Sequence, residues 1–155
     1  MNPKPSANCY ALIKHFEGCE LTAYLCPAKI PTIGYGNTFY ADGKPVKLGD
    51  KITKEQAEAL LPNVVEKFAQ SVNKAVKRII LQHEFDALVS FTYNVGIGNF
   101  SKSTLCQKVN ANAPVSEIVA EFMKWNKACG KVLDGLTKRR KAEAHLYSSN
   151  QLKFE

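Results

Sequence analysis

Apolar residues recur along most of the chain at the spacing of an amphipathic helix. The first such run lies between Ser6 and Gly18 and contains Cys9, Leu12, Ile13 and Phe16 at positions i, i+3, i+4 and i+7. This spacing predicts a helix that Ser6 caps and that Gly18 ends. Glu17 then lies in the last turn of that helix.

The pattern changes between Leu21 and about Asp50. Short runs with Tyr, Thr and Ile alternate there with turn residues, namely Pro27, Pro31, Gly34, Gly36, Gly43 and Gly49. Such runs predict a small antiparallel sheet with tight turns. We expect no other β structure in the chain.

A long helical pattern follows from Thr53. Thr53 with Gln56 three residues later is a capping box, and apolar residues then continue at helical spacing to about Val76. Pro62 interrupts this pattern, because proline removes a backbone hydrogen bond and crowds the preceding turn. We therefore expect a kink or a break near Leu61, and so two helices.

The second half of the chain predicts further helices. The expected segments are a buried helix over 83–96, a turn-rich stretch over 96–100, a short helix over 103–110, a helix from Pro114 to Gly130, and a basic helix over 135–149. Together these elements predict an α+β fold. The prediction is one domain over 1–155, with a mostly helical body, a small β lobe at about 21–50 and a cleft between them.

Composition narrows the partners without choosing one. The 155 residues are 45% apolar, enough for one core, and 21 basic against 14 acidic side chains give a formal net charge of +7. This charge favours an anionic partner: nucleic acid, a membrane surface or an acidic cell wall. Neither a secretion signal nor a membrane-crossing run is recognisable, so we expect the protein to be held in the cytoplasm.

The cysteines do not suggest a metal site. Their number is odd and they form no C-x-x-C pair, and the three histidines lie far apart; the cysteines are Cys9, Cys19, Cys26, Cys106 and Cys129. We expect no zinc and no cofactor, and we interpret most of these thiols as small buried side chains kept reduced. Cys26 is the exception.

Glu17 is a candidate general acid. A carboxyl group in the last turn of a helix faces the negative end of the helix dipole, which disfavours its ionised form. A glycosidase acid needs this effect, because it must hold its proton near neutral pH. The alternative is a solvated surface glutamate, and Glu20 lies as near to the following loop as Glu17 does.

The spacing around Glu17 carries a resemblance. Glu17, eight residues, Cys26, five residues and Thr32, followed by Ile-Gly-Tyr-Gly, is similar to the catalytic signature of phage-type lysozymes, the endolysins of glycoside hydrolase family 24. In that family the pattern is Glu, eight residues, Asp or Cys, five residues, Thr. The similarity continues over 85–105 and 130–147, and so spans nearly the whole chain.

The resemblance implies a lysozyme-like fold and an activity. It implies hydrolysis of the β-1,4 bond between N-acetylmuramic acid and N-acetylglucosamine in peptidoglycan, with bacterial lysis at the end of a phage cycle. It makes Glu17 the general acid, with Cys26 and Thr32 positioning a water on the opposite face of the sugar, consistent with inversion. Two alternatives stay open for Cys26, a thioglycoside-forming nucleophile and a packing residue, and Thr32 has the alternative of a plain strand residue.

Further residues are weaker candidates. Tyr93 and Ser103, by their position around the turn-rich segment, are candidates to line the saccharide groove. Arg139 and Arg140 lie in the basic C-terminal stretch, where a solvated helix face is the first interpretation and a role facing the site is the second. Asn37 stands where many family members carry His, which favours a neutral hydrogen-bonding role.

The expected partners follow from this assignment. They are peptidoglycan glycan strands and, through charge, anionic envelope surfaces; nucleic acid is not expected, and the protein is expected to be a monomer. It would act on the wall after a holin releases it from the host cytoplasm. Two rival functions remain, a lytic transglycosylase acting on the same bond and a non-catalytic cationic binder.

Overall fold

The computed structural model describes residues 3–26, 29–128 and 130–154. The chain forms two compact units. The sheet unit is Ile13–Lys67, and the helical unit is Met1–Leu12 together with Phe68–Glu155. Helices α1 (Ala7–Glu17) and α2 (Lys54–Ala75) contribute residues to both units.

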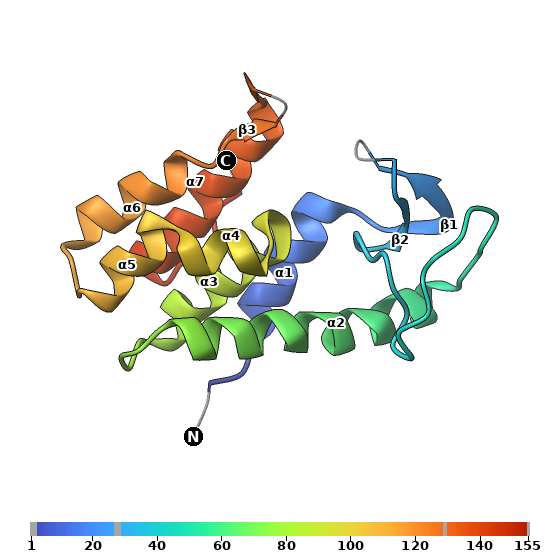
Figure 1. Cartoon of the computed structure of the whole chain (residues 1–155), viewed down its shortest axis with the longest axis horizontal. Helices are drawn as coiled ribbons and strands as arrows, with labels where there is room; N and C mark the ends of the chain where they lie inside the picture. The colour runs from blue at the N-terminus through green and yellow to red at the C-terminus, as the bar shows by residue number, and fades with distance from the viewer. Residues whose placement is uncertain (1–2, 27–28, 129, 155) are drawn as a thin grey trace. The chain divides into compact units, whose positions relative to one another are not determined.

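The sheet unit contains an antiparallel hairpin of β1 (Glu20–Leu25) and β2 (Pro31–Gly34). Tyr24 pairs with Thr32, whereas Glu20 pairs with Gly34, so the register shifts between Glu20 and Tyr24. An irregularity of this kind bends a strand and changes the direction of its side chains. The hairpin lies within the predicted β segment, at the blue end of the colour range in Figure 1.

A small apolar core supports this hairpin. Ala23, Ile33 and Val46 are buried together, and the partly buried side chains of Tyr40 and Ile52 pack against them. Isolated bridges join the hairpin to the loop that follows it, including one between Thr22 and Lys51.

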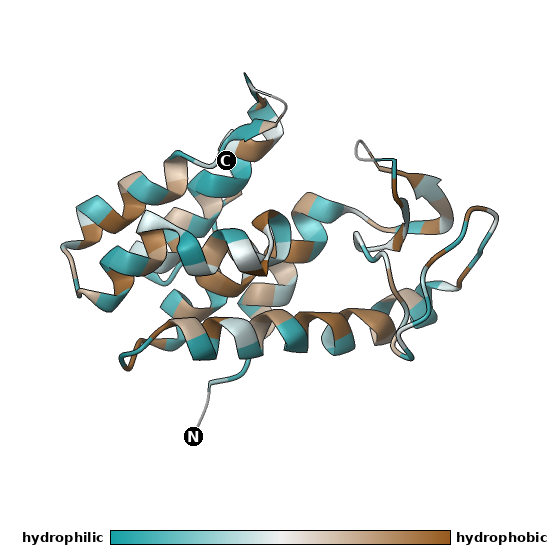
Figure 2. Ribbon diagram, viewed as in Figure 1, coloured by the Kyte–Doolittle hydropathy of each residue, from teal (hydrophilic) through white to brown (hydrophobic). Residues whose placement is uncertain are grey.

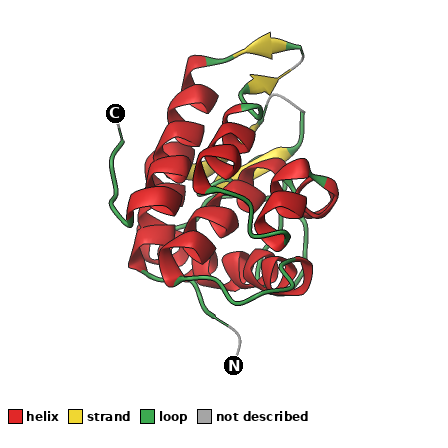
Figure 3. Cartoon of the chain, turned by 90° about the vertical axis from the view of Figure 1, so that its left-hand side faces the viewer, coloured by secondary structure: helices red, strands yellow, loops and turns green. Residues whose placement is uncertain are grey.

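The helical unit is built around packed helices from the second half of the chain. The elements are α3 (Gln82–Val95), α4 (Ile97–Lys102), α5 (Thr104–Asn110), α6 (Val115–Met123) and α7 (Asp134–Ser149). Helix α7 packs against α3 and α6. Figure 3 draws the helices of the chain in red. Apolar and polar residues alternate around each helix, as the brown and teal segments in Figure 2 show.

Aromatic side chains form the centre of this unit. The ring of Phe91 lies edge-on to three others, with centroid distances of 6.2 Å to Phe100, 5.4 Å to Phe122 and 5.6 Å to Trp125. Phe122 also contacts Tyr147 at 5.7 Å. Edge-to-face contacts of this type are favourable beyond the apolar area that they bury.

Several sequence predictions are confirmed. The α+β class is right, α1 ends at Glu17, and α7 occupies the predicted final helix. The capping box is present, because the Thr53 amide donates to Gln56 Oε1 at 2.8 Å and the Gln56 amide donates to Thr53 Oγ1 at 3.1 Å. Local hydrogen bonding was enough to place this helix start.

Two helix predictions in the second half are wrong, and so is the expectation of no further β structure. The segment predicted as a turn-rich stretch over 96–100 forms most of α4. The predicted helix from Pro114 to Gly130 ends at Met123, and a second hairpin follows, made of β3 (Lys127–Ala128) and β4 (Lys131–Val132). Gly130 has a φ of 79°, the left-handed conformation that a tight turn needs and a helix forbids. Cys129 lies outside the described residues.

The predicted division of the long helix at Pro62 is also wrong. Helix α2 runs as one element from Lys54 to Ala75 with Pro62 inside it, as Figure 1 shows. Pro62 is exposed, so water can reach the backbone carbonyl that loses its partner there. The buried face of Ala57, Leu61 and Val65 continues past the proline and stabilises the helix.

Ser6 does precede α1, but its hydroxyl is used elsewhere. The Ser6 carbonyl accepts from the Cys9 amide at 3.0 Å, while the Ser6 hydroxyl donates to the Asp86 carboxylate on α3. The Ser6 amide also donates to Asp86 at 2.9 Å. Ser6 therefore fastens the start of α1 to α3.

Within the described part of the chain, every helix is too short or too polar to serve as a membrane span.

Candidate active site

Glu17 is the last residue of α1, as the sequence predicted. The helix stops because Gly18 takes a φ of 67°, and the Gly18 amide closes the last turn by donating to the Lys14 carbonyl at 3.1 Å. The Glu17 side chain is half-buried. A carboxyl group at this position is held by a rigid element and can still be reached by a ligand.

The Glu17 carboxyl lies against Gly36. A Cβ atom added to Gly36 would be 2.6 Å from Glu17 Oε1, closer than real contacts allow, and 3.1 Å from its Cδ, a tight contact. Gly36 also has a φ of 86°, which L side chains rarely adopt. Glycine is thus required twice at this position, once for the backbone conformation and once for the space that the carboxyl occupies.

The turn that contains Gly36 is closed by backbone pairing. Ile33 and Asn37 exchange two hydrogen bonds of 2.9 Å, which leave Gly34, Tyr35 and Gly36 as the loop between them. Asn37 is 1% exposed, and its Oδ1 accepts from the Tyr35 amide at 3.3 Å. The hydrogen-bonding role predicted for Asn37 is confirmed.

Cys26 lies at the end of the β1 strand. Its side chain is half-buried, its amide donates to the Ile30 carbonyl at 3.1 Å, and its carbonyl accepts from the Lys29 amide at 2.7 Å. Lys29 has a φ of 63°, so a non-glycine residue occupies the left-handed region in this turn. The two residues after Cys26 lie outside the described residues.

Thr32 is buried in β2 with a defined hydroxyl orientation. It is 4% exposed, and its Oγ1 donates to the Ile30 carbonyl at 2.8 Å. Because the hydroxyl hydrogen is used in this bond, the oxygen presents its lone pairs to any further partner. Toward a water molecule Thr32 is therefore an acceptor.

Tyr24 is a candidate that the sequence interpretation missed. It pairs with Thr32 across the hairpin and is 37% exposed. Partial desolvation, followed by the charges of Glu17, Glu20 and Cys26, raises the pKa of the Tyr24 phenol. Tyr24 thus lies within electrostatic range of both Glu17 and Cys26. The sequence signal that could have identified Tyr24 was its place two residues before Cys26 on a predicted strand.

Tyr93 and Ser103 lie in the helical unit. Tyr93, near the end of α3, is half-buried, and its ring centroid is 5.1 Å from that of Phe68. Ser103 is 5% exposed and caps α5: its hydroxyl accepts from the Cys106 amide at 3.0 Å and donates to the Phe100 carbonyl at 2.6 Å. A role for either residue in the saccharide groove stays a prediction.

Arg139 and Arg140 on α7 do not lie on a solvated face, so our first interpretation of these two residues is wrong. Arg139 is 3% exposed and Arg140 is fully buried. Both bind Glu143, with Nε to carboxylate distances of 3.1 Å and 2.8 Å respectively. The Ser90 hydroxyl donates to the same carboxylate at 2.6 Å. Buried charges need such partners, and these side chains bind one another inside the unit.

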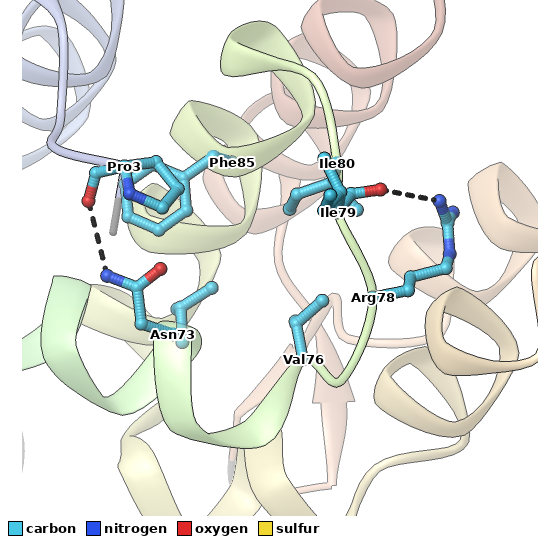
Figure 4. Close-up of a pocket in the computed structure, with 8 residues that line it drawn as sticks. Pro3, Asn73, Val76, Arg78, Ile79, Ile80 and Phe85 are labelled. Atoms are coloured by element: carbon cyan, nitrogen blue, oxygen red, sulfur yellow. Dashed lines mark hydrogen bonds between the residues drawn. The ribbon is translucent and has the colours of Figure 1, made fainter. Parts of the chain in front are cut away.

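The helical unit also contains a cavity, and its lining does not provide a general acid. It has a volume of about 350 Å³ and is lined by Pro3, Val72, Asn73, Val76, Arg78, Ile79, Ile80 and Phe85. Figure 4 shows its two polar side chains bonded to backbone carbonyls, Asn73 to Pro3 at 3.2 Å and Arg78 to Ile79 at 3.2 Å. None of the described residues that line it is a carboxylic acid. In the described ranges, no three His, Cys, Asp or Glu side chains gather as metal ligands would.

Comparison with known proteins identifies the family. The family model described as phage lysozyme matches residues 14–143, which include Glu17, Cys26 and Thr32. The chain belongs to the phage lysozyme family. The fold is therefore lysozyme-like, as the resemblance in the sequence implied.

Individual relatives of the chain support its assignment to this family. The endolysin of Bacillus phage PZA is 45% identical over 140 residues, which are 89% of this chain and 52% of that protein. The chain spans about half the length of the first curated relatives it matches.

Two solved structures are similar over nearly their whole length. An endolysin from Escherichia coli O157:H7 phage FAHEc1 has a TM-score of 0.88 and 45% identity, with 97% of this chain and 96% of that chain covered. The muramidase domain of SpmX from Asticaccaulis excentricus has a TM-score of 0.85 and 34% identity, with 96% and 99% covered.

Proposed function

We propose that this protein is a peptidoglycan-degrading endolysin that hydrolyses the β-1,4 bond between N-acetylmuramic acid and N-acetylglucosamine. Membership of the phage lysozyme family supports the substrate class. The observation that carries the site is the Glu17 carboxyl, fixed at the end of α1 against Gly36 and within electrostatic range of Tyr24, which pairs with Thr32.

In this proposal Glu17 is the general acid. Its carboxyl proton passes to the glycosidic oxygen while the bond from that oxygen to the anomeric carbon breaks, and the bonding electrons stay with the leaving oxygen. Placement on a helix end and against a glycine supports this role, because a general acid must be oriented before the bond breaks.

Water is the nucleophile on the opposite face of the sugar. Thr32 accepts a hydrogen bond from this water, since its own hydrogen is donated to the Ile30 carbonyl. Cys26 is the second group on that side and stands where an inverting glycosidase often has a carboxylate. The water oxygen bonds to the anomeric carbon and releases its proton to solvent, and the Glu17 carboxylate takes up a proton from solvent, so one water is consumed for each bond.

Product analysis with Glu17→Gln tests this function. Purified peptidoglycan is digested with parent and variant protein, and the released muropeptides are analysed by mass spectrometry. We expect the parent to add one water to each cleaved bond, and Glu17→Gln to lose at least about 100-fold of the rate, because general acid catalysis contributes about 10² to 10⁴.

Glu20→Gln is the matched control. Glu20 is an exposed glutamate three residues further on, and its variant should keep parental activity. Anhydro products from the parent would instead indicate a lytic transglycosylase, and lysis by Glu17→Gln at the parental rate would indicate a non-enzymatic mode of action.

Cys26 is tested by two replacements. Cys26→Asp should keep substantial activity because a carboxylate can also orient or deprotonate water, whereas Cys26→Ala should lose most of it. Full activity in the alanine variant would make Cys26 a packing residue.

The cellular role follows from the same activity. We propose that the enzyme is a monomer, that it acts on glycan strands of the wall after holin-dependent release from the host cytoplasm, and that its net charge of +7 aids contact with anionic envelope surfaces.

A further inference from the structure

Tyr35 is a buried aromatic residue inside the turn that supports Glu17. It is 3% exposed and stands between Gly34 and Gly36, in the loop closed by Ile33 and Asn37. Two glycines on either side of one residue are expected to make a turn flexible, because each glycine permits many backbone conformations. The contacts of the Tyr35 side chain restrict this freedom.

Two lysines hold the Tyr35 side chain. Lys54 Nζ donates to the Tyr35 hydroxyl at 2.7 Å and lies 5.0 Å from the centre of the ring. Lys14 Nζ lies 5.7 Å from the same centre. Both distances are within the range of cation–π attraction. The hydrogen bond to Tyr35 also raises the pKa of the Lys54 ammonium.

The same cluster is bonded to the helix that carries Glu17. Lys14 lies one turn before Glu17 on α1, and its Nζ is 2.8 Å from Glu58 Oε2 on α2. The pKa of the Glu58 carboxyl lies below its usual value, chiefly because Lys14 donates a hydrogen bond to it. Partial desolvation acts in the opposite direction, and the charge of Lys14 and a hydrogen bond from Tyr35 lower the pKa further. The Tyr35 side chain thus contacts the start of α2 through Lys54 and the last turn of α1 through Lys14.

We propose that Tyr35 is a positioning residue, whose phenol fixes the turn so that the open face of Gly36 receives the Glu17 carboxyl. This inference rests on the proposed role of Glu17. The Glu17 carboxyl occupies the space beside Gly36 that a Cβ would fill, since an added Cβ would be 2.6 Å from Oε1. A turn that loses its anchor changes the orientation of the acid, and a small misplacement of a catalytic group is costly.

The interpretation as a plain packing residue makes a different prediction. Packing depends on the ring, which phenylalanine keeps, whereas the proposed role depends on the hydroxyl and its bond to Lys54. Tyr35→Phe therefore separates the two. Tyr40→Phe is a matched control, because Tyr40 lies in the same unit and its hydroxyl donates to Asp50 Oδ2 at 2.7 Å, not to Lys54 or to the turn that holds Gly36.

Steady-state kinetics on soluble peptidoglycan fragments, measured across pH, test the proposal. We expect Tyr35→Phe to lower kcat about three- to tenfold with little change in KM, and to shift the alkaline limb of the pH profile. Tyr40→Phe should keep the parental kcat and profile. Melting temperatures of the two variants show whether a loss of kcat follows a loss of protein stability. If both variants lose stability and kcat together, the proposal fails.

Lys54 supplies a second, exposed position for the test. Lys54→Met should reproduce the kcat loss and the shifted profile, and Lys54→Arg should restore most of the rate, because arginine keeps a cationic donor. Parental kcat and profile in both Tyr35→Phe and Lys54→Met would overturn the proposal. If Glu17→Gln is inactive in the same assay, that result leaves the proposed function intact; if Glu17→Gln is active, the proposed function itself fails.

Discussion

Two glutamates on helices show how the two units use the same side chain differently. Glu143, on α7 in the helical unit, is fully buried, and its oxygens bind Arg139, Arg140 and Ser90. Glu17, at the end of α1 in the sheet unit, is half-buried and lies against Gly36. The first carboxylate is closed off from solvent, and the second is partly exposed beside a glycine, where a ligand can reach it. The residue type does not separate them, but the surroundings do.

The largest effect is expected at Glu143. Glu143→Gln leaves two buried guanidinium groups without their carboxylate, and breaking a buried ion pair on one side costs about 3–5 kcal/mol. Urea denaturation should show this loss in the free energy of unfolding. Asp134→Asn on the same helix is the control, because Asp134 is exposed in the first turn and should cost less than about 1 kcal/mol. Equal losses in the two variants would contradict the buried network.

A smaller effect on stability but a larger one on catalysis is expected at Gly36. Gly36→Ala places a Cβ where the Glu17 carboxyl lies and adds a left-handed backbone penalty of about 1–2 kcal/mol. We expect the rate of peptidoglycan hydrolysis to fall at least about tenfold, because the acid must move.

Gly43→Ala isolates the backbone penalty. Gly43 has a φ of 87°, almost that of Gly36 at 86°, yet an added Cβ there meets nothing within 4 Å. Both variants should show a similar drop in melting temperature, and only Gly36→Ala should lose activity in proportion to its contact with Glu17. Similar activities would mean that the position of Glu17 does not depend on Gly36.

The smallest effect concerns pH and the helical unit. Hydrogen bonds from Lys124 and Lys108 hold the pKa of the Glu121 carboxyl below its ordinary value of 4.5. Because the folded pKa is lowered, this stabilisation is complete above the unfolded pKa and is lost as the pH falls through the folded one. The free energy of unfolding should fall less steeply below about pH 4.5 in Glu121→Gln than in the parent, as measured by urea titrations across pH. Parallel curves would contradict the shift.

The sequence by itself predicted the features that depend on neighbours along the chain. These features lie within short segments, where local hydrogen bonds and backbone conformation decide the structure. They are the capping box of Thr53 and Gln56, the end of α1 at Gly18, and the spacing of Glu17, Cys26 and Thr32. For the same reason the family resemblance was recognisable from one continuous stretch.

Only the tertiary structure decided the features that depend on residues far apart in the chain. Three such features join different elements of the fold. They are the burial of Arg139 beside Ser90, the hydrogen bond from Lys54 to Tyr35, and the contact of Gly36 with Glu17. The hydrophobic pattern of a helix also could not show that Pro62 is tolerated or that α6 stops before a second hairpin. Packing and desolvation act on distance in space, and the spacing of residues in one sequence records only distance along the chain.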